Sequence, residues 1–474
     1  MDSLELAFLP ARRLHAAYCT GQLSPVDVIE CIGKRVHTLN PTLNVFCALM
    51  LDSAMEAARA SQERYRTRAH IGPLDGIPVS IKDHAHVRGV PTTLGSMLRK
   101  DFVPDWDSPV VARLRAAGTL IFAKTNMPEF GWKGVTDNAL FGTTRSPWRL
   151  DVTPGGSTGG AAAVAAGIGP ITLGADGAGS IRIPAAFCGI FGLKPSFGRI
   201  PQAPRGGTES LSHDGPLART VEDAADMLDV MSGPDDLDRN SLPEPGYSFA
   251  QRIEHAEDDL RRRSAVVAWS PDLGFAKVDP EVRELTERAA RAFEDLGCHV
   301  EEVDPGWDDP FAILEPLYLG AMGGALRHHY RDPDSRMDPY LVQLLKEGES
   351  LSAYDYGAAV IARVEFYERV RRLMDGYDLL LTPSTATPPF QLDRVAPDLV
   401  GGEAPEHFFS WTPFTYPFNL TGQPAASVPA GFTSEGLPVG LQIVGRRHAD
   451  LSVLQAAKAF ERARPWSAHR PPVA

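Results

Sequence analysis

The sequence predicts an α/β fold in which helices surround a central β-sheet. Apolar runs typical of strands alternate with segments of helical period between residues 77 and 123, and again between residues 265 and 303. The third observation is a glycine-rich stretch, 151–199, with two turns that are each built around a serine. With 474 residues the chain can bury a large core, and α/β proteins of this length often form one domain.

The amino-terminal part is expected to be helical. Residues 3–20 carry apolar positions at loose helical spacing, and residues 52–65 are rich in Ala, Glu and Arg. Between them, Ser24-Pro25 is typical of an N-cap followed by proline at the first helical position. We expect Asn40-Pro41 to end that helix.

A strand–helix–strand unit is predicted next. After a turn at 72–76, residues 77–83 form an apolar run that ends in charge, residues 108–118 a helix, and residues 119–123 a strand. Such a unit pairs its strands in parallel through a right-handed crossover. Lys82 then lies at the carboxyl end of its strand, where open α/β sheets bind ligands. A solvated lysine is the alternative that spacing alone leaves open.

The central stretch contains the turns 154–160 and 174–180, centred on Ser157 and Ser180. Between them we expect a small-residue helix at 161–166 and a strand at 168–173, and after them a strand at 190–193 and a capped helix at 220–228. Glycine is costly where a chain only needs to be ordered. Its density here therefore indicates a backbone that approaches a ligand or aims several N–H groups at one point.

The carboxyl-terminal half predicts a second α/β run. Residues 232–262 are polar and Pro-rich, which favours a connector, and residues 305–375 are expected to be mostly helical with scattered aromatics. The remaining expectations are strands at 265–269, 298–303, 378–382 and 439–445, helices at 279–296 and 450–462, and a mobile surface loop at 391–410.

Composition limits the class of partner. The formal net charge is −13 without a long Lys/Arg run, which argues against nucleic acid. The five cysteines show no CxxC spacing, which gives no zinc pattern and suits a reducing compartment. The amino terminus lacks the order of a signal peptide, and no apolar run approaches membrane-spanning length. A cytoplasmic protein without a metal or a membrane partner is the expectation.

The serine turns suggest three chemistries. Phosphate or dinucleotide binding fails, because no GK[ST] follows and neither turn has the G-x-G-x-x-G spacing. Residues 155–159 fit the G-x-S-x-G nucleophile elbow, which would need a histidine such as His328 or His448. The third chemistry uses both serines and a lysine. Burial can lower a lysine pKa enough to make it a base, and the N–H groups of residues 177–180 can form an oxyanion hole.

Several strings closely resemble the amidase signature family. They are PGGSTGGAAAVAAG, LGADGAGSIRIPAAFCGIFGLKPSFGRIP, PLDGIPVSIKD around Lys82, KTNMPEFG at 124–131 and NLTGQPAASVPAGFTSEGLPVGLQIVG. The likeness covers roughly residues 10–230 and 410–465 and is loose between them. It implies the amidase signature fold, a mixed central β-sheet surrounded by helices. It also implies one amidase domain over 1–474, with a signature core at about 70–230 and a variable helical substrate-pocket region at about 305–410.

The resemblance implies a Ser–cis-Ser–Lys triad. Matched position by position, Ser180 is the nucleophile, Ser157 the bridging serine in a cis peptide, and Lys82 the base. The two serines are one residue closer in sequence than is usual in the family. The oxyanion hole would be formed by the backbone of Gly177, Ala178 and Gly179.

Other residues near the triad are assigned by their chemistry. Arg182 could bind a substrate carboxylate, but pairing with Asp176 to hold the turn is favoured. The aromatic residues Phe130, Trp132 and Tyr318 suggest an apolar or aryl substrate. Specificity is expected in the loops 125–140, 305–360 and 385–420, where the resemblance is weakest.

The implied activity is hydrolysis of the C–N bond of a small-molecule amide through an acyl-enzyme, with ester or carbamate hydrolysis as related chemistry. No metal or cofactor is implied, and a homodimer is the family-level expectation. Two alternatives remain open at this point. The chain could be the glutamine-hydrolysing amidase subunit of a tRNA amidotransferase, with stable partner subunits, or a non-enzymatic binding module.

Overall fold

Eleven strands form one sheet in the computed structural model, which describes residues 2–204, 206, 208, 210–332 and 334–473. The strands of this sheet are β1 (Phe46–Leu49), β2 (Pro78–Lys82), β3 (Leu120–Thr125), β6 (Ile171–Asp176), β7 (Phe191–Lys194), β8 (His213–Ala218), β9 (Val266–Trp269), β10 (His299–Glu302), β11 (Leu379–Pro383), β12 (Ala425–Phe432) and β13 (Pro438–Gly445). Their order across the sheet is β1-β3-β2-β6-β8-β7-β12-β13-β11-β9-β10. A separate pair consists of β4 (Asp137–Asn138) and β5 (Gly142–Thr143).

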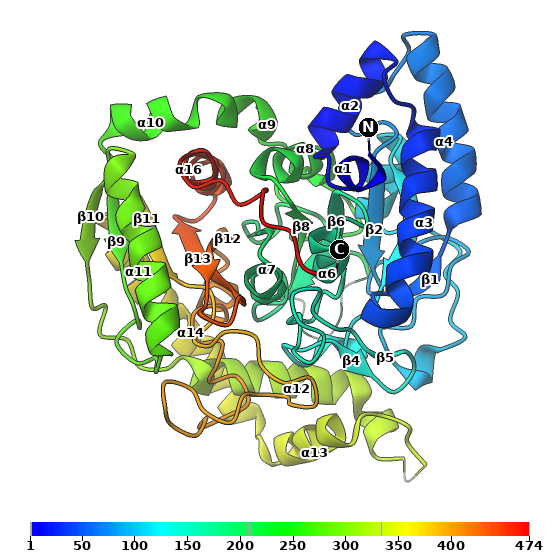
Figure 1. Ribbon diagram of the computed structural model, residues 1–474. Helices are drawn as coiled ribbons and strands as arrows, with labels where there is room; N and C mark the ends of the chain where they lie inside the picture. The colour runs from blue at the N-terminus through cyan, green and yellow to red at the C-terminus, as the bar shows by residue number, and fades with distance from the viewer. Residues whose placement is uncertain (1, 205, 207, 209, 333, 474) are drawn as a thin grey trace.

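Helices surround this sheet (Figure 1). They are α1 (Ser3–Ala7), α2 (Ala11–Thr20), α3 (Pro25–Leu43), α4 (Leu51–Arg66), α5 (Pro109–Ala116), α6 (Gly160–Ala165), α7 (Arg182–Cys188), α8 (Val221–Met231), α9 (Phe249–Arg252), α10 (Ala256–Arg263), α11 (Pro280–Asp295), α12 (Phe311–Tyr330), α13 (Pro339–Glu347), α14 (Ala353–Asp375), α15 (Pro417–Leu420) and α16 (Asp450–Ala463). Because the sheet contains both parallel and antiparallel pairs, the predicted mixed α/β architecture is confirmed.

The amino-terminal helices follow the sequence closely. Ser24 caps α3 in a reciprocal capping box with Asp27, as the Ser-Pro pair indicates. Pro41, however, does not end this helix, which continues to Leu43. In the last turn a proline removes one hydrogen bond only, and the N–H of Asn44 still bonds to the carbonyl of residue 40 at 2.8 Å.

The predicted strand–helix–strand unit is present and places Lys82. Strand β2 pairs in parallel with β3, and helix α5 makes the crossover. Strand β6 lies in parallel on the other side of β2. Since the carboxyl ends of parallel strands share one edge, Lys82 at the end of β2 lies beside the 177–180 turn that follows β6.

Some elements differ from the prediction. Strand β6 begins three residues later than expected, and β8 and β12 were not predicted, because Gly-Pro in β8 and Pro-Ala-Gly in β12 interrupt the alternation that marks a strand. The expected connector at 232–262 contains α9 and α10, since the polarity of α10 hides its helical period. Residues 391–410 contain two isolated β-bridges but no regular strand or helix among the described residues.

The region 305–375 is helical, as predicted. Helices α12 and α13 lie at the bottom of the view in Figure 1, and α14 packs against α12. Their apolar side chains form a second hydrophobic cluster with residues of α7, β11 and the 408–420 segment. This packing brings one face of α12 over the sheet edge that carries Lys82.

Candidate active site

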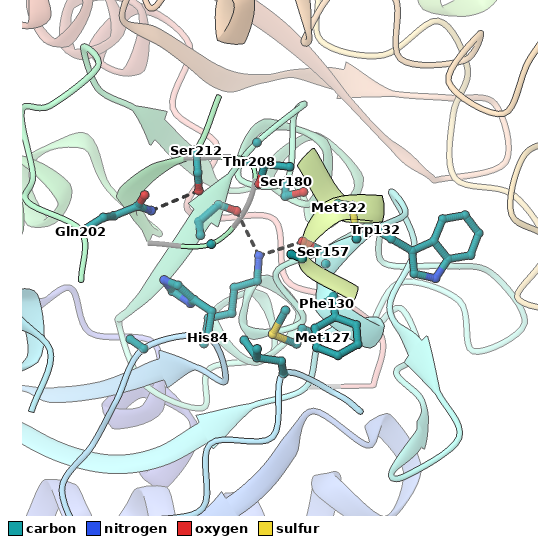
Figure 2. Close-up of a pocket in the computed structure, with 18 of the residues that line it drawn as sticks. His84, Met127, Phe130, Trp132, Ser157, Ser180, Gln202, Thr208, Ser212 and Met322 are labelled. Atoms are coloured by element: carbon teal, nitrogen blue, oxygen red, sulfur yellow. Dashed lines mark hydrogen bonds between the residues drawn. The ribbon is translucent and has the colours of Figure 1, made fainter. Parts of the chain in front are cut away.

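A cavity of about 460 Å³ lies at the carboxyl ends of β2 and β6. Lys82, Ser157 and Ser180 all contribute to its wall, and Figure 2 shows the two serines close together. The structure thus brings together three residues from separate elements. Lys82 ends β2, Ser157 precedes α6, and Ser180 lies between β6 and α7.

Lys82 is buried, with 2% of its surface exposed. Its Nζ is 2.8 Å from Ser157 Oγ and donates to the carbonyl oxygen of Ala175 at 3.0 Å. Burial lowers the pKa of the Lys82 amine to about 7, although the charges of Asp176 and Asp214 oppose the shift. A neutral amine can donate one N–H to Ala175 and accept the Ser157 proton with its lone pair.

Ser157 is held by tight backbone packing. The Gly156–Ser157 peptide bond is cis, as the resemblance implies. A side chain at position 156 would bring its Cβ within 2.6 Å of the Val135 backbone, so only glycine fits there. The hydroxyl of Ser157 faces Lys82, whereas the elbow candidates His328 and His448 are exposed at the surface. The geometry therefore favours the two-serine chemistry over the elbow.

The turn that carries Ser180 is organised by Asp176. Its carboxylate accepts the N–H of Gly179 at 2.6 Å and the N–H of Ile181 at 3.2 Å. Gly179 has φ +128°, and a Cβ there would lie 2.5 Å from Thr415 Oγ1. The Gly179 N–H is thus engaged, although it was predicted to hold an oxyanion.

The other predicted oxyanion groups remain open to a ligand. Gly177 and Ala178 line the cavity, and their N–H groups have no protein acceptor within the described chain. The N–H of Ser180 is in the same state. Ser180 Oγ makes no hydrogen bond to Ser157 among the described residues, and such links often tighten only when a substrate binds.

Arg182 pairs with Asp176, as the sequence favours. Both side chains are 0% exposed, and the guanidinium bonds to both carboxylate oxygens at 3.0 Å. Burial alone would raise the pKa of Asp176, but Arg182 holds it well below its usual range. Arg182 also bonds to Asn419 and Gln442, so it ties the turn to the carboxyl-terminal segment.

We expect Arg182→Met to lower the free energy of unfolding by about 3–5 kcal/mol, because Asp176 would be left as an unpaired buried charge. Urea unfolding would measure the change. The matched control is Arg371→Met, whose ion pair with Glu368 is exposed and whose loss should have no measurable effect. Equal midpoints for the two variants would contradict the structural role of Arg182.

The predicted substrate contacts divide into two kinds. Phe130 lies in the cavity wall, and Tyr318 reaches it from α12 with its hydroxyl donating to the Trp132 carbonyl at 2.9 Å. The Trp132 indole is 0% exposed, points away from Ser157 in Figure 2 and stacks on Tyr340 at 5.4 Å. Trp132 therefore faces the cavity with its backbone.

Sequence reasoning missed most of the remaining wall. One side is apolar and includes Met127, Met322 and Phe409. The opposite side is polar, where Asp214 Oδ1 accepts from Gln202 Nε2 at 2.5 Å and lies 2.9 Å from His84 Nε2. These residues come from distant elements, so no local spacing could have identified them.

Fold and cavity together define an enzyme class, the hydrolases that act on acyl bonds, since a buried amine, hydroxyl groups and open backbone N–H groups share one cavity. The chain belongs to the amidase family, whose family model, described as Amidase, matches residues 27–454. It is an amidohydrolase of the amidase signature type, so the binding-module alternative is set aside.

Relatives match along the whole chain. The chain is 40% identical over 479 residues to the acylamidase of Rhodococcus erythropolis, and the match covers 99% of this chain and 98% of that protein. It is 35% identical over 491 residues to one subunit of the Glutamyl-tRNA(Gln) amidotransferase of Desulforapulum autotrophicum, at 98% of both chains. A solved bacterial aryl acylamidase of the amidase signature family has a TM-score of 0.89 and 32% identity, at 97% of both chains. None of the described helices combines the length and apolar character needed to cross a membrane.

Proposed function

We propose that the protein hydrolyses the C–N bond of small carboxamides through a Ser180–Ser157–Lys82 relay. The observation that carries the proposal is the buried contact of Lys82 Nζ with Ser157 Oγ at 2.8 Å, in the cavity that Ser180 also lines. Because burial keeps the lysine largely neutral near pH 7, it is available as a base.

The reaction proceeds in two halves. Ser180 Oγ attacks the carbonyl carbon while its proton passes to Ser157, and the Ser157 proton passes to Lys82. The N–H groups of Gly177 and Ala178, with that of Ser180, stabilise the tetrahedral oxyanion. The C–N bond then breaks as the relay returns the proton to the leaving amine. Water attacks the acyl-enzyme through the same relay and releases the acid.

The cavity wall supports a substrate with an apolar or aryl group. Phe130, Met127 and Met322 give the site an apolar side that can bury such a group. Tyr318, Met322 and Phe409 come from the 305–410 region, which supports a single amidase unit over the chain with this region as its substrate wall. Esters and carbamates present the same carbonyl and are expected as weaker substrates.

Glutamine hydrolysis is the competing function, favoured by the similarity to the amidotransferase protein. The test is a panel of acyl-p-nitroanilides set against release of ammonia from glutamine by the purified chain. We expect p-nitroaniline release, highest for aryl or apolar acyl groups, and little ammonia from glutamine. Ammonia release without any turnover of the anilides would favour the amidotransferase function instead.

The kcat/KM of the amidase reaction is expected to rise with pH through about 7 and to level off above it. Below its pKa Lys82 carries the proton and cannot accept another, so the reactive form grows as pH increases. Initial rates at subsaturating anilide between about pH 5 and about pH 9 would measure this. A flat profile, or a rate that falls with rising pH, would contradict a neutral lysine base.

A further inference from the structure

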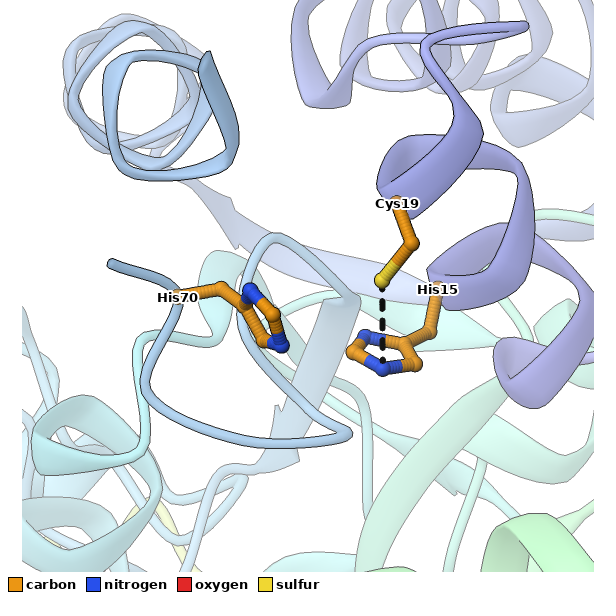
Figure 3. Close-up of side chains that lie close together, drawn as sticks. All are labelled: His15, Cys19 and His70. Carbon is orange, nitrogen blue, oxygen red and sulfur yellow. Dashed lines mark hydrogen bonds between the residues drawn. The ribbon is translucent and has the colours of Figure 1, made fainter. Parts of the chain in front are cut away.

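Two histidines and a cysteine meet at the surface of the amino-terminal helices (Figure 3). His15 and Cys19 lie one turn apart on α2, and His70 lies in the segment between α4 and β2. One ligand atom of each lies within 4.8 Å of the others. None of the three lines the cavity described above. They lie near the segment that enters β2, whereas Lys82 is at the opposite end of that strand.

The spacing of these atoms matches a metal coordination sphere. In a tetrahedral zinc site, a nitrogen ligand and a sulfur ligand are about 3.5 Å apart, given bond lengths of about 2.0–2.1 and about 2.3 Å. The Nε2 of His15 is 3.6 Å from the Sγ of Cys19. Two ligands are therefore already at the required separation, and His70 needs only a small shift of an exposed side chain to become the third.

Hydrogen bonding fixes the protonation of the His15 ring. The Tyr65 hydroxyl donates its single proton to the carbonyl of Asp75 at 2.9 Å. Its oxygen must then accept from His15 Nδ1, which lies 2.7 Å away. Nε2 is left with a free lone pair directed at Cys19. Histidine ligands of metals usually donate their other ring N–H to such an orienting partner.

Tyr65 also orients the second histidine. Its ring stacks on that of His70 with centroids 5.2 Å apart and an interplanar angle of 6°. The rings of His15 and His70 meet edge to face at 5.5 Å. One buried-edge tyrosine thus positions both imidazoles, which is more organisation than a chance meeting of surface side chains requires.

We propose that His15, Cys19 and His70 bind one zinc ion, with water in the fourth position. Two imidazole nitrogens and a thiolate sulfur suit zinc and similar transition metals, whereas Mg²⁺ and Ca²⁺ prefer oxygen ligands. Binding releases the thiol proton of Cys19 to solvent. The ion would join α2 to the segment before β2, so it should raise the melting temperature without taking part in amide hydrolysis.

The test uses the full chain, freed of metal with a chelator and titrated with Co²⁺ and then Zn²⁺. We expect one equivalent of Co²⁺ with a thiolate-to-cobalt charge-transfer band, which Zn²⁺ displaces. Cys19→Ser should remove the band, and His15→Ala or His70→Ala should weaken binding at least about tenfold. Tyr65→Phe should weaken it about 10–100-fold. His37→Ala, an exposed histidine on α3, is the matched control and should bind as the wild type does.

A second measurement needs no variant. Zn²⁺ should slow alkylation of Cys19 in the wild type, and Mg²⁺ should not. The proposal is overturned if no charge-transfer band forms, if the band survives in Cys19→Ser, if His37→Ala weakens binding equally, or if Mg²⁺ protects the thiol as well as Zn²⁺. Amide hydrolysis by each variant verifies its fold, since these side chains lie outside the cavity.

Discussion

Replacing Ser180 with alanine is expected to lower kcat/KM for an acyl-anilide by about 10⁴–10⁶-fold. The alanine has no oxygen to attack the carbonyl, so no acyl-enzyme can form. The open N–H groups around the cavity and the binding walls would remain, and they account for the residual rate. Initial rates of p-nitroaniline release, with protein concentration checked by unfolding, would measure the loss.

A serine-directed fluorophosphonate provides a test of the same residue that does not depend on turnover. We expect the label on Ser180 in the wild type and no label in Ser180→Ala. Ser427→Ala is the matched control, because Ser427 is a buried serine that bonds to Ser384 outside the cavity. Labelling of Ser157, or near-normal turnover by Ser180→Ala, would show that the nucleophile has been assigned to the wrong serine.

Replacing Lys82 is expected to lower kcat by about 10²–10⁴-fold, the usual contribution of a general base. Lys82→Met removes the amine but keeps a long side chain in the buried site. Lys82→Arg keeps a cation that cannot lose its proton, so it should be as inactive as the methionine variant. The comparison distinguishes a base from a positive charge, since a charge alone would be restored by arginine.

Lys124 offers the control for this experiment. It is a buried lysine on the neighbouring strand β3, paired with Asp83 at 2.8 Å and outside the cavity wall. Lys124→Met should lower stability while the folded fraction keeps its kcat. If Lys82→Arg retained activity, or if Lys124→Met lost as much kcat as Lys82→Met, the role of Lys82 as the base would be wrong.

Local sequence predicted the elements whose signals are local. The cap at Ser24-Pro25, the parallel unit of β2 and β3, and the helix α11 after Asp279 follow from caps, spacing and apolar period. Strands β8 and β12 escaped because their Gly and Pro residues have the composition of turns. Pairing with neighbours, β6 and β7 for β8, is what makes that segment a strand.

The candidate site shows the same division. Motif resemblance placed Lys82, Ser157 and Ser180, and the structure brings them to one cavity. It could not show that Asp176 takes the Gly179 N–H or that the Trp132 indole faces away from Ser157. Those facts depend on side-chain packing, which the spacing of residues along a chain does not encode.

The sequence alone determined the α/β class, the two serine turns and the lysine at a strand end, because each is written in a few consecutive residues. Only the tertiary structure decided the walls of the cavity, the pKa of Lys82 and the meeting of His15, Cys19 and His70. Each of these arises where separate elements pack. The physical reason is that burial and distance, which set electrostatics and ligand geometry, exist only after the chain has folded.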